Sequence, residues 1–251
     1  MAKSVDDRRS EPEPGGYFHW SRDAAVSLFA VLPLWVAYEV LRLCLTPDER
    51  NGAEILLRYE ILRLGEGAHL ALALAFCVLV VAAAKSLVRR RVPWLRVAAV
   101  IALEGTVWAL LLGPVASTLA SWAKTTLAAA PAVAHVREAL VANLVGSLGA
   151  GIFEELVFRL GLMSALVWLG LRAVRAWSLP TWLAGAFGVA VSALVFSWFH
   201  HLCGEPFDAR VFAFRTMAGV LLGALMWGRG YGVCVYTHTI YDLHFYLASN
   251  G

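Results

Sequence analysis

Seven stretches of about 20 mostly apolar residues recur along this chain, each as long as an α-helix has to be to cross a bilayer. Backbone polar groups in lipid must be paired within the spanning segment, which leaves helices as the structure for such runs. They therefore predict an all-α, polytopic transmembrane helix bundle with about seven spans. The stretches are residues 23–43, 66–86, 97–119, 148–171, 180–201, 210–228 and 231–249.

The composition argues against a soluble domain. Hydrophobic residues make up 60% of the 251 residues and charged residues only 16%, against about 45–50% and about 25% in soluble domains. A soluble core of this length could not hide so much apolar surface beneath so few charged residues. The net charge is only +3, and no basic run is interleaved with aromatic residues, so we expect no nucleic-acid partner.

The chain is expected to divide into a polar tail and two membrane parts. Residues 1–22 predict a cytoplasmic tail, residues 23–147 hold the N-terminal transmembrane helices with interfacial segments, and residues 148–251 form a C-terminal helical core. Segments 52–64 and 136–147 are expected to lie on the membrane surface as amphipathic helices.

The distribution of Lys and Arg predicts the orientation. If the N-terminus is cytoplasmic, 12 of the 21 Lys and Arg residues fall on the cytoplasmic side and 6 on the opposite side. Positive charge is concentrated in the cytoplasmic loops of membrane proteins. We therefore expect an integral multi-pass protein with a cytoplasmic N-terminus, in a bacterial-type cell membrane.

Charged residues inside the apolar stretches are candidates for function, because each costs about 2.5–3.5 kcal/mol at the bilayer centre on insertion scales. Glu154, Glu155 and Arg159 form one such group in the fourth stretch. On an α-helix Arg159 lies one turn after Glu155 and can pair with it, whereas Glu154 points about 100° away and is left for chemistry. The alternative is a plain buried salt bridge between Glu155 and Arg159.

Two more groups follow in later stretches. Phe196 and His200 are four residues apart, so the phenyl ring can hold the imidazole; an interfacial histidine among aromatic residues is the alternative. His238 and Asp242 have the same spacing, and a histidine oriented only for packing is the alternative. Together, carboxylates and imidazoles on three helices can activate a water molecule and stabilise the oxyanion of a tetrahedral intermediate.

In this order the three groups resemble the motifs of the CPBP intramembrane proteases, also called the CAAX-protease and bacteriocin-processing, or ABI, family. The family motifs are EExxxR, FxxxH and HxxxN or HxxxD, matched here by Glu154-Glu155-x-x-x-Arg159, Phe196-x-x-x-His200 and His238-x-x-x-Asp242. The resemblance covers about residues 148–249. It implies a membrane endopeptidase, with residues 148–251 as its catalytic helix core.

The resemblance also implies roles for the first two motifs. Glu154 would be the base that activates water, assisted by His200. Glu155 and Arg159 would hold the constellation together.

The third motif would form or orient the oxyanion site, but it departs from the usual pattern. Asp242 stands where asparagine is common in the family, and an ionised carboxylate would repel an oxyanion. Either burial keeps Asp242 protonated, or it orients His238 instead.

The resemblance leaves the cofactor and substrate open. A glutamate-type mechanism without a metal is the preferred expectation, although Glu154, His200 and His238 could bind zinc with one open position. The expected partners are the bilayer and a membrane-associated protein or peptide, such as a prenylated CAAX-type protein, a sorting tail or a secreted-peptide precursor.

Two other functions are alternatives. One is a non-proteolytic immunity or scaffold protein of the same fold, which would have no need of Glu154 and both histidines. The other is a proton-coupled transporter, for which clear inverted repeats are lacking.

Overall fold

The computed structural model describes residues 15–45, 51–65, 67–122, 138–203 and 205–249. Within these residues the chain is helical and has no strand, which confirms the predicted all-α class. Six helices are long and apolar enough to cross a membrane. They correspond to the first six predicted stretches, because an uninterrupted apolar run of this length favours a helix in lipid.

The elements are arranged in two groups along the chain. The N-terminal group consists of α1 (Tyr17–Trp20), α2 (Ala24–Leu45), α3 (Gly52–Arg63), α4 (Gly67–Arg90) and α5 (Trp94–Trp122). The C-terminal group consists of α6 (Glu138–Gly149), the π-helix η2 (Ala150–Met163), α7 (Ser164–Ala176), α8 (Trp182–Leu202), α9 (Ala209–Arg229) and α10 (Tyr231–Ser249).

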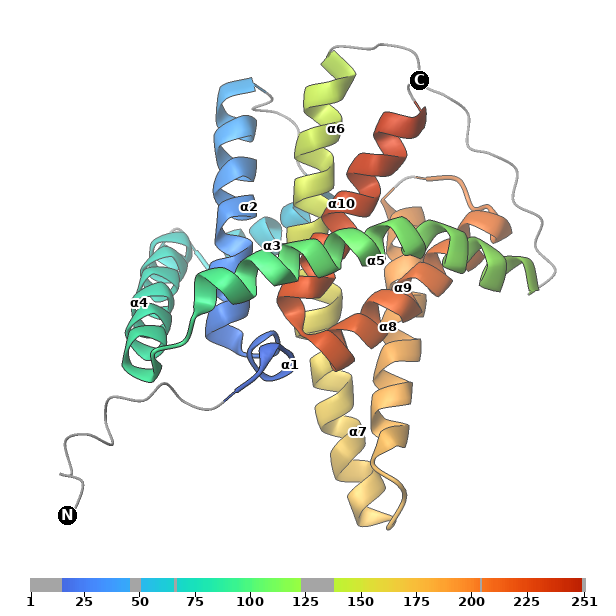
Figure 1. The fold of residues 1–251 in the computed structure, drawn as a ribbon. Helices are drawn as coiled ribbons and strands as arrows, with labels where there is room; N and C mark the ends of the chain where they lie inside the picture. The colour runs from blue at the N-terminus through green and yellow to red at the C-terminus, as the bar shows by residue number, and fades with distance from the viewer. Residues whose placement is uncertain (1–14, 46–50, 66, 123–137, 204, 250–251) are drawn as a thin grey trace.

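The fourth span is longer than predicted. Helices α6, η2 and α7 follow one another without a break, and 36 residues, Val141–Ala176, qualify as one candidate span. They form the long upright column of Figure 1. The segment 136–147 that was expected to lie on the membrane surface overlaps this candidate span from Val141 onward, and α6 buries Val145 and Leu148 in a cluster with residues of α2 and α10. Residues 136 and 137 lie outside the described residues.

Helix α10 lies at the centre of the bundle. It contacts α2, α5, α6, η2 and α9, and Figure 1 shows α5 crossing in front of it. It occupies the seventh predicted stretch but is not among the six candidate spans, because Tyr, Thr, His and Asp replace aliphatic residues along it. The polar helix is thus surrounded by apolar ones.

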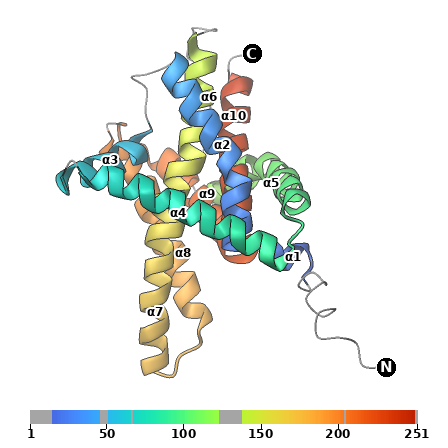
Figure 2. The same cartoon turned by 90° about the vertical axis from the view of Figure 1, so that its left-hand side faces the viewer.

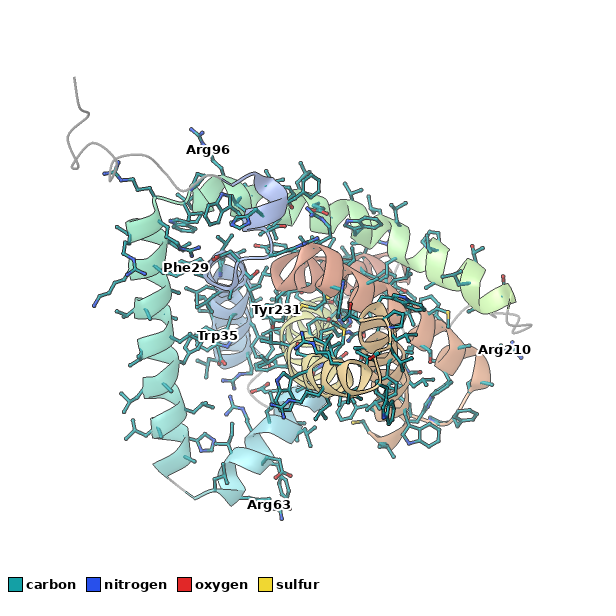
Figure 3. The ribbon with its side chains drawn as sticks, turned by 90° about the horizontal axis from the view of Figure 1, so that it is seen from below. Phe29, Trp35, Arg63, Arg96, Arg210 and Tyr231 are labelled. Atoms are coloured by element: carbon teal, nitrogen blue, oxygen red, sulfur yellow. The ribbon has the colours of Figure 1, made fainter. Side chains whose placement is uncertain are left out.

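The outer layer is formed largely by α3, α4 and α5. Figure 2 shows α4 running obliquely across the outside of α2, with α3 near one end of it. Seen from below in Figure 3, Arg63, Arg96 and Arg210 lie at the outer edge of the molecule, whereas Tyr231 lies inside the bundle. The Tyr231 hydroxyl donates to the Ile152 carbonyl at 3.2 Å and so joins α10 to η2.

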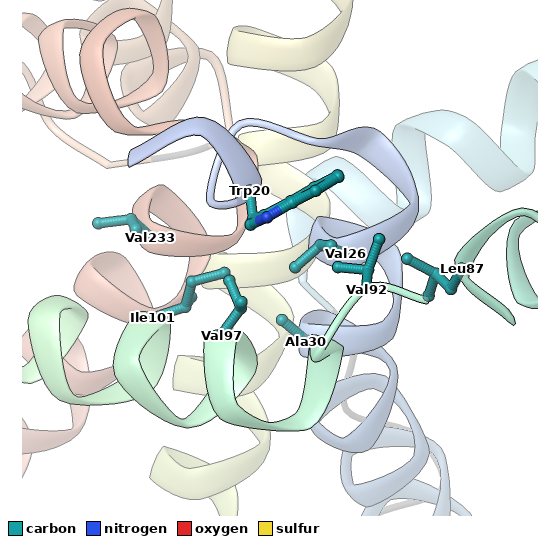
Figure 4. Packing of buried hydrophobic residues seen from close by; sticks show 8 residues of the cluster. All are labelled: Trp20, Val26, Ala30, Leu87, Val92, Val97, Ile101 and Val233. Carbon is teal, nitrogen blue, oxygen red and sulfur yellow. The ribbon is translucent and has the colours of Figure 1, made fainter. Parts of the chain in front are cut away.

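The last part of the predicted polar tail is folded. Trp20 of α1 is buried in a cluster that includes Val26, Leu87, Ile101 and Val233 (Figure 4). This cluster joins the start of α2 to α4, α5 and α10. Residues 1–14 of the predicted tail lie outside the described residues.

Ion pairs neutralise charges within the candidate spans. Arg42 donates to Glu39 at 2.7 Å within α2. Arg229 donates to both carboxylate oxygens of Glu104 at 2.6 and 2.7 Å, and Tyr17 also donates to Glu104. These charges are satisfied by neighbours and are separate from the groups described next.

Candidate active site

The first motif lies on the π-helix, not on an α-helix as the sequence reasoning assumed. The backbone N–H of Ser164 donates to the Arg159 carbonyl five residues before it, which is the i→i+5 spacing of a π-helix. Glu154 and Glu155 are both buried, with exposed fractions of 5% and 0%. Single π-turns occur often at functional sites, and here two adjacent carboxylates face the interior together.

Glu155 connects the first motif to α10. Its Oε1 lies 3.0 Å from Arg159 Nη1 and 2.7 Å from His238 Nδ1. The Cys234 thiol donates to Oε2 at 2.9 Å. The buried salt bridge between Glu155 and Arg159 that was the alternative interpretation is therefore present. The same carboxylate also contacts His238, so the salt bridge is part of the candidate site.

Glu154 faces residues of α8 and α10 and the residue directly before α3. Its Oε2 lies 3.7 Å from His200 Nε2 and 4.0 Å from His238 Nε2. Its Oε1 accepts a hydrogen bond from Asn51 Nδ2 at 2.8 Å. One oxygen is thus engaged by an amide, while the other faces two imidazoles.

The orientation of His200 follows from its own helix. His200 Nδ1 lies 3.0 Å from the Phe196 carbonyl oxygen. A carbonyl oxygen only accepts, so Nδ1 carries the proton in this contact, and Nε2 of the neutral ring is left as an acceptor facing Glu154. The Phe196 ring packs edge-on against His200 at 5.0 Å and His238 at 6.0 Å between centroids, and covers both imidazoles on one side.

The third motif faces the same centre. Asp242 Oδ2 lies 3.5 Å from His238 Nε2, one helical turn away on α10. The Arg159 guanidinium lies 4.2 Å from the centroid of the Phe196 ring, a cation–π contact that joins η2 to α8. The structure thus brings together all the predicted residues, namely Glu154, Glu155, Arg159, His200, His238 and Asp242.

Two polar neighbours of these residues were not predicted from the sequence. Cys234 could have been found, because Cys234, His238 and Asp242 recur every four residues and share a face of α10. Asn51 had no such signal, because it is 103 residues from Glu154 and precedes a helix that was expected only to lie on the membrane surface.

An ion pair lies beside the site in the connection between α8 and α9. The Glu205 backbone N–H donates to the His200 carbonyl at 3.4 Å, and the Glu205 carboxylate accepts from Arg215 at 2.6 and 3.0 Å. Burial alone would raise the pKa of Glu205. The hydrogen bonds and the charge of Arg215 lower it by more than that, so the pKa of Glu205 lies below its usual value. Glu205 therefore stays ionised and neutralises the Arg215 guanidinium near neutral pH.

The sequence left open whether Glu154, His200 and His238 bind a metal ion. In the part of the chain that the structure describes, no group of three or more His, Cys, Asp or Glu side chains is arranged to hold a metal ion. Glu154, His200 and His238 converge, but at 3.7 and 4.0 Å from Oε2 to the two imidazole nitrogens. Such spacing suits polar groups that share a water molecule.

One comparison with known proteins finds a relationship. The model of the family described as Rce1-like, type II CAAX prenyl endopeptidase, matches residues 136–244. The match includes η2, α8 and the part of α10 that carries His238 and Asp242. Neither a search of curated proteins nor a search of solved structures found a significant match.

Proposed function

From the match of residues 136–244 to the Rce1-like, type II CAAX prenyl endopeptidase family, we propose that this chain is an intramembrane endopeptidase of that kind and hydrolyses a peptide bond in a prenylated, membrane-associated substrate. The observation that carries the proposal is the convergence of Glu154 with His200 and His238 inside a bundle of membrane-spanning helices. A carboxylate and two imidazoles at this spacing suit the activation of one water molecule.

Glu154 acts as the general base in this mechanism. It takes a proton from the water molecule while the water oxygen attacks the carbonyl carbon of the scissile bond, and the C=O π electrons move to the oxygen. His200 orients the water through Nε2, because its Nδ1 is bound to the Phe196 carbonyl. When the tetrahedral intermediate collapses, the C–N bond breaks and protonated Glu154 returns the proton to the leaving amine.

His238 stabilises the oxyanion. Its ring lies between the carboxylates of Glu155 and Asp242, at 2.7 Å from Nδ1 and 3.5 Å from Nε2. Two neighbouring carboxylates favour a ring protonated on both nitrogens, so that Nε2–H can donate to the developing negative charge. Asp242 then acts through His238 and does not have to contact the oxyanion itself. This role suits an aspartate as well as an asparagine.

The substrate class is tested with the full-length protein in liposomes and an internally quenched peptide that carries a farnesylated cysteine before three C-terminal residues. The matched control is the same peptide without the farnesyl group. We expect cleavage of the farnesylated peptide only, and a loss of cleavage of about 100-fold or more in His200→Ala. Equal cleavage of both peptides contradicts the prenylated class, and cleavage that His200→Ala leaves intact contradicts the site.

Removal of metal ions is expected to leave the rate unchanged. The mechanism assigns water activation to Glu154 and His200, and no step is routed through a metal. The measurement is kcat for the farnesylated peptide after dialysis against EDTA and after addition of 1,10-phenanthroline. A loss of activity that Zn²⁺ restores would contradict this mechanism and favour zinc binding by Glu154, His200 and His238.

A further inference from the structure

We infer that Asn51 is a positioning residue for Glu154, contributed by a segment outside the family-matched residues 136–244. Its amide holds one carboxylate oxygen so that the other faces His200 and His238. The inference rests on the proposed function, in which Glu154 is the general base.

The contacts of Asn51 set the orientation of its amide. Its Oδ1 accepts the backbone N–H of Ala53 at 2.8 Å, and its Nδ2 donates to Glu154 Oε1 at 2.8 Å. A backbone N–H only donates and a carboxylate oxygen accepts, so the two ends of the amide cannot be exchanged. Asn51 is thus the N-cap of α3 and a hydrogen-bond donor to Glu154 at the same time.

The first turn of α3, which follows Asn51, is held in place by buried contacts. Glu54, in the first turn of α3, is buried, accepts a hydrogen bond from Tyr38 and pairs with Arg58 at 2.5 Å. Ala53 is fully buried. The start of α3 is therefore fastened to α2, and the Asn51 side chain is presented to η2 from a fixed backbone.

A glycine at the junction of α6 and η2 allows Asn51 to come close to Glu154. A Cβ on Gly149 would lie 3.0 Å from both Asn51 Cβ and Tyr38 Cε2, closer than ordinary packing allows. Gly149 is the last residue of α6, directly before the π-helix. The absence of a side chain there lets the cap of α3 reach the carboxylate.

Holding one oxygen restricts the rotation of the carboxylate. With Oε1 bound to the amide, Oε2 is the oxygen that faces both Nε2 atoms, at 3.7 and 4.0 Å. Hydrogen bonds to ionised groups are about twice as strong as neutral ones. A general base has to be held close to the reactive geometry, and small misplacements reduce rates strongly.

The test separates the donor function of Asn51 from its capping function. Asn51→Ser and Asn51→Asp keep a good N-cap but lack the amide donor, whereas Asn51→Gln keeps the amide but is a poor cap. We expect the Ser and Asp variants to melt at the wild-type temperature but to lose about 10- to 100-fold in kcat for the farnesylated peptide, with little change in KM. Asn51→Asp should lose the most, because it places a second carboxylate beside Glu154, and Asn51→Gln should recover part of the rate.

The opposite order overturns the inference. If Asn51 is only a helix cap, Ser and Asp should retain the wild-type kcat, while Gln loses stability and activity together. Glu154→Gln, measured in parallel, distinguishes this from failure of the proposed function. An inactive Glu154→Gln with fully active Asn51→Ser refutes the positioning role alone, whereas an active Glu154→Gln refutes the proposed mechanism as well.

Discussion

Replacing Glu154 by glutamine is expected to lower kcat for the farnesylated peptide by about 100- to 10,000-fold, the usual contribution of a general base. A neutral amide cannot take the proton from water. The variant should fold, because the glutamine oxygen can still accept the hydrogen bond from Asn51 Nδ2. The measurements are kcat in liposomes and thermal unfolding in detergent.

Glu39→Gln is the matched control for this experiment. It also neutralises a carboxylate within a candidate spanning helix, but Glu39 pairs with Arg42 of the same helix, α2. Its kcat should equal that of the wild type. A Glu154→Gln variant that stays within about tenfold of Glu39→Gln is incompatible with Glu154 as the base.

Replacing Arg159 by methionine is expected to destabilise the protein by about 3–5 kcal/mol, because it removes the guanidinium that compensates the buried Glu155 carboxylate. Arg159 and Glu155 have fully buried side chains that lie 3.0 Å apart. The substitution also removes the cation–π contact with Phe196. The free energy of unfolding in mixed micelles is the quantity to measure.

A double variant and a surface control show whether the loss of stability in Arg159→Met comes from the buried ion pair. Glu155→Gln combined with Arg159→Met should regain part of the stability, because both charges of the buried pair are removed together, yet its kcat should stay low because His238 loses its ionised partner. Arg63→Met breaks a pair that is largely exposed and should cost less than about 1 kcal/mol. A loss in Arg159→Met no larger than in Arg63→Met would show that the buried pair contributes little.

The helical fold and most of the candidate site were predictable for a physical reason. Apolar runs of bilayer length favour helices wherever lipid surrounds them. The i, i+4 spacing of His238 and Asp242 places both on one face of α10 whatever the bundle around it. Local periodicity therefore carried these predictions, and the structure brings the three motifs together.

The features that were missed depend on tertiary context. Residues 150–163 form a π-helix, and the spacing of Glu154, Glu155 and Arg159 in the sequence does not distinguish it from an α-helix. The candidate fourth span begins at Val141, and α6 buries Val145 and Leu148 against residues far away in the sequence. The contact of Asn51 with Glu154 joins segments 103 residues apart, a distance over which periodicity carries no information.

The length of the column formed by α6, η2 and α7 has a consequence for the surrounding lipid. Its 36 residues correspond to about 50 Å of helix, roughly 20 Å more than the hydrocarbon core of a bilayer. Such a hydrophobic mismatch is relieved by tilting of the helix or by local thickening of the membrane. With η2 in the middle of the column, we expect Glu154 to lie well inside the hydrocarbon layer when these 36 residues cross the bilayer. The proposed hydrolysis would then require the peptide bond to move from the headgroup region to this depth, and a water molecule to reach the same depth.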